Sequence, residues 1–495
     1  MQSNREERPA AVLVAIQLPG VSEEDHEADL RELSRLVRTL GYDVVGTVTQ
    51  RRGSLAAGAV LGEGKLKELA ELTGGTGVIP SGAKERKTKA RARFDNDGEE
   101  EERGEDAEDD ETDDSDEEET NSTEKKAGSP DRKATVVVVD HEISPSQARN
   151  LERATGADVL DRTGVIIEIF HRHARSREAK LEVEIARLSY VAPRLRETGG
   201  GGDRQRGGIG GKGAGESALE LDRRKIRDRI AELRRELTSV GREQSTRRAL
   251  RKDQRRVALV GYTNAGKSSL MRALTGSEVL VADKLFATLD TTVRALHPEV
   301  RPRILISDTV GFIKKLPHDL VASFRSTLDE ALEASLLLYV ADASDPTFRS
   351  QLEVTRTVLG EIGAGEVPNK LLLNKADRLS ADEREALALE FPDAILLSAK
   401  IPEDVAALRQ TIIAFFESFM IDGELLIPYA KQSLVSEVYE NAKVISETYD
   451  DEGGHLVVRA EPAALARLKS LLAREERREE GKGEGEGEGE GEERA

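Results

Sequence analysis

Short apolar runs alternate with amphipathic stretches along the first eighty residues of the chain. The runs at residues 11–17 and 42–50 have the length and composition of strands, whereas residues 22–41 and 64–72 carry leucine at helical spacing, which predicts helices. The run TVVVV at residues 135–139 predicts a further strand. Alternation of this kind is typical of an α/β domain.

We assign residues 1–198 to this N-terminal α/β domain, which has one long interruption. Residues 81–133 contain too few apolar side chains to offset the entropy lost on ordering, so we expect a disordered acidic insertion. Because the strand at residues 135–139 resumes the sheet, the insertion interrupts one domain and does not separate two. A solvated spacer is the simpler interpretation, and a polyelectrolyte arm for a basic partner is the alternative.

A glycine-rich basic segment separates two helical patterns. A helix is expected around residues 176–195, and residues 199–215, GGGGDRQRGGIGGKGAG, have no period that could build a strand or a helix. We expect a helical hairpin, broken near Gly241, within residues 199–255. One face of its long helix carries the apolar residues Leu219, Ile226, Ile230, Leu233 and Leu237.

Three further regions complete the chain. Residues 256–418 contain buried-strand patterns followed by helices, which predict a mostly parallel sheet with flanking helices. Residues 419–472 suggest a helix, a strand and a helix in a small C-terminal α/β domain, and the glycine–glutamate repeat within residues 473–495 predicts a disordered tail. The expected fold class is α/β throughout.

The formal charge of −20 is concentrated in two segments of the 495-residue chain. Residues 95–120 contain 18 acidic residues against one arginine, a net charge of −17, and residues 473–495 contain 10 acidic and 5 basic residues, a net charge of −5. Subtracting both segments from the total leaves +2 for the rest of the chain. The total charge therefore does not exclude a nucleic-acid partner.

Composition and hydropathy exclude several kinds of chemistry and location. The chain has no cysteine, which excludes disulfides, thiolate chemistry and cysteine-ligated zinc. No run of eighteen apolar residues occurs, and the start MQSNREERPA has no apolar stretch of signal-peptide length. We expect a cytoplasmic monomer without stable insertion into a membrane.

A phosphate-binding loop stands between a strand and a helix in residues 257–274. Gly261, Gly266, Lys267 and Ser268 follow the G-x-x-x-x-G-K-[ST] spacing. Glycine lets the backbone approach phosphate oxygens closely, and the free N–H groups at the start of the helix favour an anion. Lys267 would reach the β- and γ-phosphates, and the Ser268 hydroxyl would be a ligand of Mg²⁺.

Two further motifs follow strand ends. Asp308 and Gly311 lie in D-T-V-G, where the acid can hold Mg²⁺ through water and the Gly311 amide can sense the γ-phosphate. Asn374, Lys375 and Asp377 form N-K-x-D, whose aspartate can accept two hydrogen bonds from guanine N1 and N2. Adenine lacks this donor pair and would leave the carboxylate unpaired, at a cost of ~1–3 kcal/mol. A last segment is expected to cup the base: Ser398, Ala399 and Lys400.

A threonine-rich segment lies between the first two motifs, where a switch region must reach the γ-phosphate. Thr288 is the expected second side-chain ligand of Mg²⁺ and Thr292 the alternative, while an ordinary surface threonine is the simpler interpretation of either. Phe312 occupies the position at which many GTPases have a glutamine that orients the attacking water. We therefore expect slow intrinsic hydrolysis. It would be accelerated by a partner or by a backbone or water-mediated route, and the alternative is that another side chain of this chain orients the water.

Together the motifs predict a P-loop GTPase domain that binds GTP with Mg²⁺ and hydrolyses it. Catalysis is assigned to Lys267, Thr288 and Gly311, and metal ligation to Ser268 and Thr288. The residues expected to contact the nucleotide are Gly261, Tyr262, Thr263, Asn264, Ala265, Gly266, Lys267, Ser268, Phe286, Ala287, Thr288, Leu289, Asp290, Asp308, Thr309, Val310, Gly311, Asn374, Lys375, Ala376, Asp377, Ser398, Ala399 and Lys400.

With the upstream sequence, these motifs resemble the HflX family of translation-associated GTPases. GYTNAGKS, LFATLD, DTVGFIKKLPHDLVASF and NKAD are similar to the G domain of that family, and SPSQARNLE, DRTGVIIEIF, RQRGGIGGKGAGES and LELDRRKIRDRI to its upstream domain. The resemblance covers most of residues 10–420 apart from the insertion. It implies a GTP-binding domain preceded by an α/β domain and a helical hairpin that bind RNA near the peptidyl-transferase region of the large ribosomal subunit. It also implies GTP-dependent dissociation of ribosomes in stress.

Two departures from the family pattern stand out. Members often have D-P-T where this chain has Asp290, Thr291 and Thr292, which puts the role of Thr292 in doubt, and the acidic insertion is unusual. An RNA partner agrees with the basic residues of the glycine-rich segment and of the helix after it, Arg204, Arg206, Lys212, Arg223, Arg224, Lys225 and Arg227.

Two alternatives to ribosome splitting stay open. The first is a GTP-regulated ribosome assembly factor. The second is an ATP-driven RNA remodeller. The sequence contains no second phosphate loop, which argues against this alternative.

Overall fold

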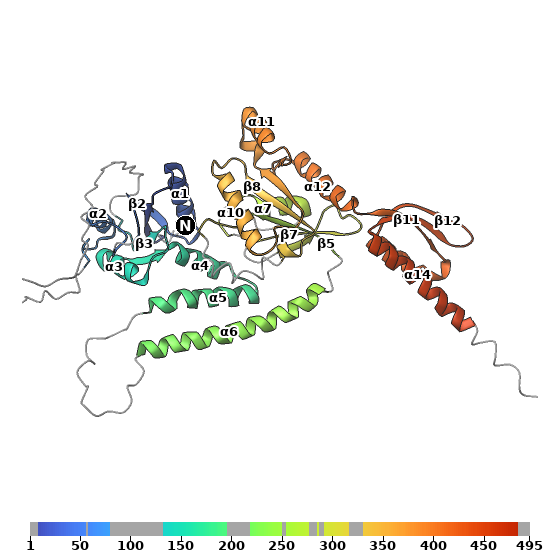
Figure 1. Ribbon diagram of the computed structural model, residues 1–495, viewed down its shortest axis with the longest axis horizontal. Helices are drawn as coiled ribbons and strands as arrows, with labels where there is room; N and C mark the ends of the chain where they lie inside the picture. Colours follow the sequence, from blue (N-terminus) through green and yellow to red (C-terminus); the bar gives the residue numbers. More distant parts are fainter. Residues whose placement is uncertain are drawn as a thin grey trace, which may run out of the picture. The chain divides into compact units, whose positions relative to one another are not determined.

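The computed structural model describes most of the chain (Figure 1). The described residues are 8–55, 58–79, 132–195, 218–249, 254–276, 285–286, 292–315 and 330–483. All but the last two residues of the predicted insertion, and the whole glycine-rich segment at residues 199–215, lie outside them. The chain divides into two compact units, Met1–Val165 and Ile166–Ala495, each of which is described by itself.

A four-stranded parallel sheet organises the first unit. Its strands, in sheet order, are β2 (Asp43–Arg51), β1 (Ala10–Gln17), β3 (Val136–Val139) and β4 (Asp158–Asp161). The register places Val12 of β1 beside Val137 of β3. Because β3 lies between β1 and β4, the chain resumes the same sheet after the insertion, as predicted.

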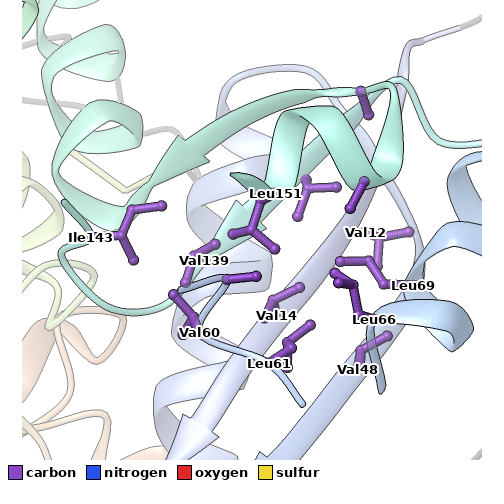
Figure 2. Close-up of a cluster of buried hydrophobic side chains, with 14 of the residues drawn as sticks. Val12, Val14, Val48, Val60, Leu61, Leu66, Leu69, Val139, Ile143 and Leu151 are labelled. Carbon is purple, nitrogen blue, oxygen red and sulfur yellow. The ribbon is translucent and has the colours of Figure 1, made fainter. Parts of the chain in front are cut away.

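Two helices of the first unit, α1 (Glu23–Thr39) and α2 (Glu63–Thr73), follow the predicted amphipathic stretches. α3 (Pro145–Thr155) follows β3, and α4 (Arg162–His173), which follows β4, extends into the second unit. Leu66 and Leu69 of α2 and Leu151 of α3 pack with Val12 and Val14 of β1, as Figure 2 shows. All five side chains are at most 3% exposed. Each such side chain contributes ~1.5–3 kcal/mol through burial, so this cluster fixes the helices on the sheet.

Two helices form a hairpin at the start of the second unit, α5 (Arg177–Val191) and α6 (Ala218–Ala249). Leu181 and Ile185 of α5 pack with Leu233 of α6, and the predicted Ile230 and Leu237 lie against this cluster. The predicted apolar face of the long helix is therefore confirmed from Ile230 to Leu237.

The predicted break near Gly241 is wrong, because α6 continues without interruption to Ala249. One glycine inside a helix costs only ~1 kcal/mol relative to alanine, which is too little by itself to end a helix as long as α6. The hairpin consists of α5 and α6, and their connection lies outside the described residues.

A six-stranded sheet forms the centre of the next part of the second unit. In sheet order its strands are β10 (Ile395–Leu396), β9 (Asn369–Asn374), β8 (Leu336–Asp342), β5 (Arg255–Gly261), β7 (Ile304–Asp308) and β6 (Thr292–Ala295). β6 runs antiparallel to β7 and all other neighbours are parallel. β8 and β5 are buried along nearly their whole length, as expected for strands covered on both faces.

Helices cover both faces of this sheet. They are α7 (Lys267–Thr275), α10 (Phe348–Glu361), α11 (Ala381–Glu390) and α12 (Pro402–Glu417). Leu270 of α7 and Leu408 and Ile412 of α12 pack with Leu259 of β5 in one core cluster, and Phe348 of α10 belongs to another. The parallel strands bring their carboxyl ends, where the predicted motifs lie, to one edge of the sheet.

A small antiparallel sheet follows, and it differs from the predicted order of helix, strand and helix. Its elements are β11 (Ile421–Ile427), α13 (Ser433–Asn441), β12 (Lys443–Tyr449), β13 (Gly454–Ala460) and α14 (Pro462–Gly483). β13 lies between β11 and β12. The prediction gave one strand where the structure has three. It missed β11 because this strand pairs with β13, much later in the chain, as in the pair Ile421 and Ala460.

The predicted tail also begins too early, since α14 continues beyond Leu472 to Gly483. Leu465, Leu468 and Leu472 anchor the first half of this helix in the core. Alanine, glutamate and arginine, which favour helices, continue it past the last apolar residue. Residues 484–495 lie outside the described part of the chain.

No helix in the described part of the chain is both long enough and apolar enough to cross a membrane.

Candidate nucleotide site

The loop between β5 and α7 requires glycine at both ends. Gly261 has a φ of +149°, and a Cβ added there would lie 2.2 Å from the carbonyl oxygen of Val340. Gly266 has a φ of +101°, and its added Cβ would lie 2.2 Å from Nδ2 of Asn374. Both glycines therefore allow close approaches to neighbouring strands that no other residue permits.

The amino end of α7 is open to an anion. Its N-cap residue, Gly266, makes no side-chain capping bond, and the first turn has no acidic residue. The first N–H groups of a helix lack partners inside the helix and carry the positive end of its dipole. The sequence of this turn therefore offers donors to a phosphate group.

Lys267, the first residue of α7, is buried beneath the loop. Its Nζ donates to the carbonyl oxygens of Gly261 at 3.0 Å and Tyr262 at 2.8 Å. Burial lowers the pKa of Lys267 to about 8, although the nearby carboxylate of Asp308 opposes this effect. A partly desolvated ammonium group held by carbonyls is poised to gain from a negative ligand.

Ser268, in the first turn of α7, lies in contact with Asp308 at the end of β7. The Ser268 hydroxyl donates to Oδ2 of Asp308 at 2.7 Å, and Asp308 is fully buried at the end of β7. A hydroxyl and a carboxylate are the oxygen ligands that Mg²⁺ prefers, so the residues present fit this ion. No group of three or more metal-binding side chains occurs among the described residues, so phosphate and water would have to complete the coordination.

The N-K-x-D residues are tied to the phosphate loop by their side chains. Nδ2 of Asn374 donates to the carbonyl oxygen of Ala265 at 2.8 Å. Nζ of Lys375 donates to the carbonyl oxygen of Asn264 at 2.8 Å and to Oδ2 of Asp342 at 2.6 Å. Two of the three side chains that define the motif therefore support the loop, and the third is available to a ligand.

That third side chain, Asp377, is oriented by the last predicted segment. The Ser398 hydroxyl donates to its Oδ1 at 2.7 Å, and Nζ of Lys400 lies 3.2 Å from its Oδ2. The hydrogen bond from Ser398 is the main cause that lowers the pKa of Asp377, which keeps the carboxylate ionised as an acceptor. Its side chain remains 26% exposed, so a ligand can reach it.

Two supporting acids were missed by the sequence analysis. Asp342, at the end of β8, pairs with Lys375, and Asp404, in the first turn of α12, accepts a hydrogen bond from the Ser398 backbone N–H at 2.7 Å. Asp342 ends a buried strand and Asp404 begins a helix. These positions were the only sequence signals of their roles.

The segment after β7 lies against the phosphate loop. The backbone of Phe312 pairs with the loop on both sides: Thr263 N–H donates to its carbonyl oxygen at 2.8 Å, and its own N–H donates to Gly261 at 3.1 Å. Phe312 is 3% exposed. Gly311, the residue before it, therefore lies directly beside Thr263.

The switch segment is described only in part. Phe286 is buried with a φ of +56°, and Thr292, the alternative metal ligand, begins β6 opposite Asp308. The other predicted residues of this segment, Ala287, Thr288, Leu289 and Asp290, lie outside the described residues.

Family models match the chain in three consecutive parts. They describe a GTP-binding GTPase N-terminal region at residues 27–79 and 121–171, a GTP-binding GTPase Middle Region at residues 173–251, and a 50S ribosome-binding GTPase at residues 256–375.

Whole-length relatives agree with these matches. "GTPase HflX" of Gluconacetobacter diazotrophicus is 64% identical over 467 residues, which cover 94% of this chain and 98% of the relative. "GTPase HflX" of Caldanaerobacter subterraneus is 35% identical over 461 residues, 92% of this chain and 91% of the relative. The crystal structure of a GTP-binding protein from Sulfolobus solfataricus in complex with GDP is 22% identical in sequence and matches 82% of this chain and 99% of its own, with a TM-score of 0.40. On the identity and coverage of the first two relatives, the chain belongs to the HflX family of GTPases.

Proposed function

We propose that this GTPase uses GTP with Mg²⁺ as a switch that controls its association with the large ribosomal subunit. One observation carries the nucleotide half of the proposal. Lys267 and Ser268 follow β5, Asp308 ends β7 and Asp377 follows β9, so all four lie at the carboxyl edge of the six-stranded sheet, which supports a guanine-nucleotide site there.

The phosphates would be held by the loop, by the start of α7 and by Lys267. The Lys267 ammonium would exchange its two carbonyl acceptors for phosphate oxygens, which favour its charged form. In hydrolysis these groups would position the phosphate chain and neutralise the charge that develops on it. Gly311, beside the loop, would offer its N–H to the γ-phosphate.

Ser268 and Thr288 would hold Mg²⁺ directly, and Asp308 would hold it through water. The bound ion would neutralise charge on the β- and γ-phosphates. The contact between Ser268 and Asp308 supports this assignment, because it keeps both oxygen ligands together.

Asp377 would select guanine. Its carboxylate, oriented by Ser398 and Lys400, would accept the N1 and N2 hydrogen bonds that adenine cannot donate. The links from Asn374 and Lys375 to the phosphate loop would couple base recognition to phosphate binding.

The ribosomal half of the proposal rests on α6 and on the family. Arg223, Arg224, Lys225 and Arg227 are exposed near the start of α6, whose apolar residues pack on α5 farther along the helix. Exposed cations on a rigid helix suit RNA phosphates. With the family model described as a 50S ribosome-binding GTPase, they support binding to the large subunit. The proposed consequence of that binding, in a cytoplasmic protein, is the splitting or rescue of ribosomes under stress.

Ribosome preparations contain other GTPases that also bind GTP. The test therefore uses a variant with altered nucleotide specificity, so that the added nucleotide binds to this protein and not to the others. Asp377→Asn exchanges a carboxylate for an amide that can donate to the 2-oxo group of xanthine, so this variant should prefer xanthosine triphosphate. We expect the variant to sediment with purified large subunits when a non-hydrolysable xanthosine triphosphate analogue is present, and to remain in the supernatant with xanthosine diphosphate.

Equal binding in the two nucleotide states would contradict the switch. Loss of assembled ribosomes in the same experiment would favour splitting, and their persistence would favour the assembly-factor alternative. Lys267→Ala in the Asp377→Asn background is the control that should not respond to either nucleotide.

A further inference from the structure

The phosphate loop contains a buried hydroxyl, that of Thr263, to which no specific role has been given beyond the expected contact with the nucleotide. Thr263 is 7% exposed, and its Oγ1 has no hydrogen-bond partner among the described residues. The neighbouring buried hydroxyls of Ser307 and Thr309 donate to strand carbonyls at 3.3 Å and 2.8 Å. A buried polar group without a partner costs ~1–3 kcal/mol, so its presence calls for a functional explanation.

Thr263 lies where two expected γ-phosphate groups meet. A Cβ added to Gly311 would lie 2.8 Å from Cγ2 of Thr263 and 3.0 Å from Nζ of Lys267. The Thr263 side chain, the Lys267 ammonium and the Gly311 backbone therefore surround one point. The hydrogen bond from Thr263 N–H to the Phe312 carbonyl, at 2.8 Å, holds the loop and the Gly311 segment together.

The same corner of the site lacks a side chain that can orient water from the usual position. Phe312 follows Gly311, and its ring has no hydrogen-bonding atom. The Thr263 side chain, whose methyl group faces Gly311, also carries a hydroxyl that can supply the missing interaction, because a hydroxyl accepts and donates hydrogen bonds.

We propose that Thr263 is a catalytic residue whose hydroxyl accepts a hydrogen bond from the water that attacks GTP. The water oxygen forms a bond to the γ-phosphorus, and the bond from the γ-phosphorus to the β–γ bridging oxygen breaks. The electron pair of that bond leaves with GDP, and the proton of the water passes to the released phosphate and then to solvent. Thr263 itself gains and loses no proton.

This role rests on the proposed nucleotide site and is independent of the ribosomal partner. It would also give the Thr263 hydroxyl its partner, since the water occupies the corner only when GTP is bound. A purely structural threonine, by contrast, would support the loop through its methyl group and its backbone.

The test separates hydrolysis from binding. Thr263→Val keeps the shape and removes the hydroxyl, and Thr263→Ser keeps the hydroxyl. We expect Thr263→Val to lower the single-turnover rate of GTP hydrolysis by about 100-fold while its Kd for GTP stays within about threefold of wild type. Thr263→Ser should keep the rate within about tenfold of wild type. Affinity for GDP with aluminium fluoride should fall in Thr263→Val in parallel with the rate.

Thr355→Val is the matched control. Thr355 is 1% exposed in α10 of the same domain, and its hydroxyl donates to the Gln351 carbonyl at 2.9 Å. This variant should hydrolyse GTP at the wild-type rate. A wild-type rate in Thr263→Val, or a loss of GTP affinity as large as the loss of rate, would overturn the proposal. Failure of the wild-type protein to bind GTP would instead contradict the proposed nucleotide site.

Discussion

The turn from β1 to α1 and the turn from β5 to α7 join comparable elements with opposite chemistry. Each leaves an interior strand of an α/β sheet and begins a helix. Before α7 the N-cap is glycine and no acid follows in the first turn. Before α1 the Ser22 hydroxyl accepts a hydrogen bond from Asp25 N–H at 3.1 Å, and the first turn contains Glu23, Glu24 and Asp25.

The difference shows how one topology can bind phosphate in one sheet and not in another. The start of α1 is capped by its own serine and lined with three carboxylates, which would repel an anion. At the start of α7, the backbone N–H donors and the positive end of the helix dipole remain available to a ligand. The β1–α1 turn is therefore not suited to bind the phosphates of ATP, as an ATP-driven RNA remodeller would require if it bound its nucleotide at this turn.

The largest expected effect comes from the glycine of the α7 turn. Gly266→Ala would strain a backbone with φ of +101° and bring a Cβ within 2.2 Å of Asn374. We expect the Kd for GDP, measured by fluorescence of a labelled nucleotide, to rise by about 100-fold, which corresponds to ~2.8 kcal/mol.

Gly20→Ala is the matched control in the α1 turn. Gly20 also has a positive φ, +85°, but its added Cβ would meet no atom within 4 Å. This variant should lose a little stability and bind GDP as wild type does. Equal loss of binding in the two variants would remove the distinction between the turns.

The next effect concerns the charge of Lys267 at the start of α7. Its pKa of about 8 in the free protein means that the side chain loses its proton as the pH rises through that value. Bound phosphates favour the charged form, so binding above this pH must take up a proton and becomes weaker. From pH 7 to pH 9 we expect the Kd for GTP to rise by about tenfold.

Calorimetry in buffers of different ionisation enthalpy would measure that proton uptake directly. GMP is the control, because it shares the titration of the guanine ring but does not carry the β- and γ-phosphates. A GTP affinity with the same pH dependence as that of GMP would contradict the assignment to Lys267.

The smallest effect belongs to the capped helix. Ser22→Ala removes the side-chain cap of α1, which should cost ~1 kcal/mol of stability. We expect the midpoint of thermal unfolding of the first unit to fall by about 2–4 °C, as followed by circular dichroism, while GTP affinity is unchanged. Weaker GTP binding in this variant would show that the first turn of α1 contributes to the nucleotide site.

Local spacing made the G-domain fold and the nucleotide motifs predictable. The loop from Gly261 to Ser268 is one continuous segment, and the glycines that it needs are visible without knowledge of their neighbours. Asp308 and Asn374 each end a buried apolar strand, and parallel strands place such ends at one edge of a sheet.

Contacts between distant segments were not predictable in the same way. Asp342 pairs with Lys375 across neighbouring strands, and β11 finds its partner in β13, so neither feature leaves a periodic signal near itself. The end of α14 depends on helix propensity beyond its core, which a reading of apolar spacing ignores. The Thr263 hydroxyl, which has no partner within the described part of the chain, became visible only when the packing of Gly311 against the loop was known.

GTP hydrolysis at physiological salt, measured for the purified protein alone and with purified large ribosomal subunits, is the most direct test of the proposed ribosomal switch. We expect slow hydrolysis by the protein alone, strong stimulation by the subunits, and neither activity in Lys267→Ala. Unchanged hydrolysis in the presence of the subunits, with GTP binding intact, would contradict the proposed ribosomal switch.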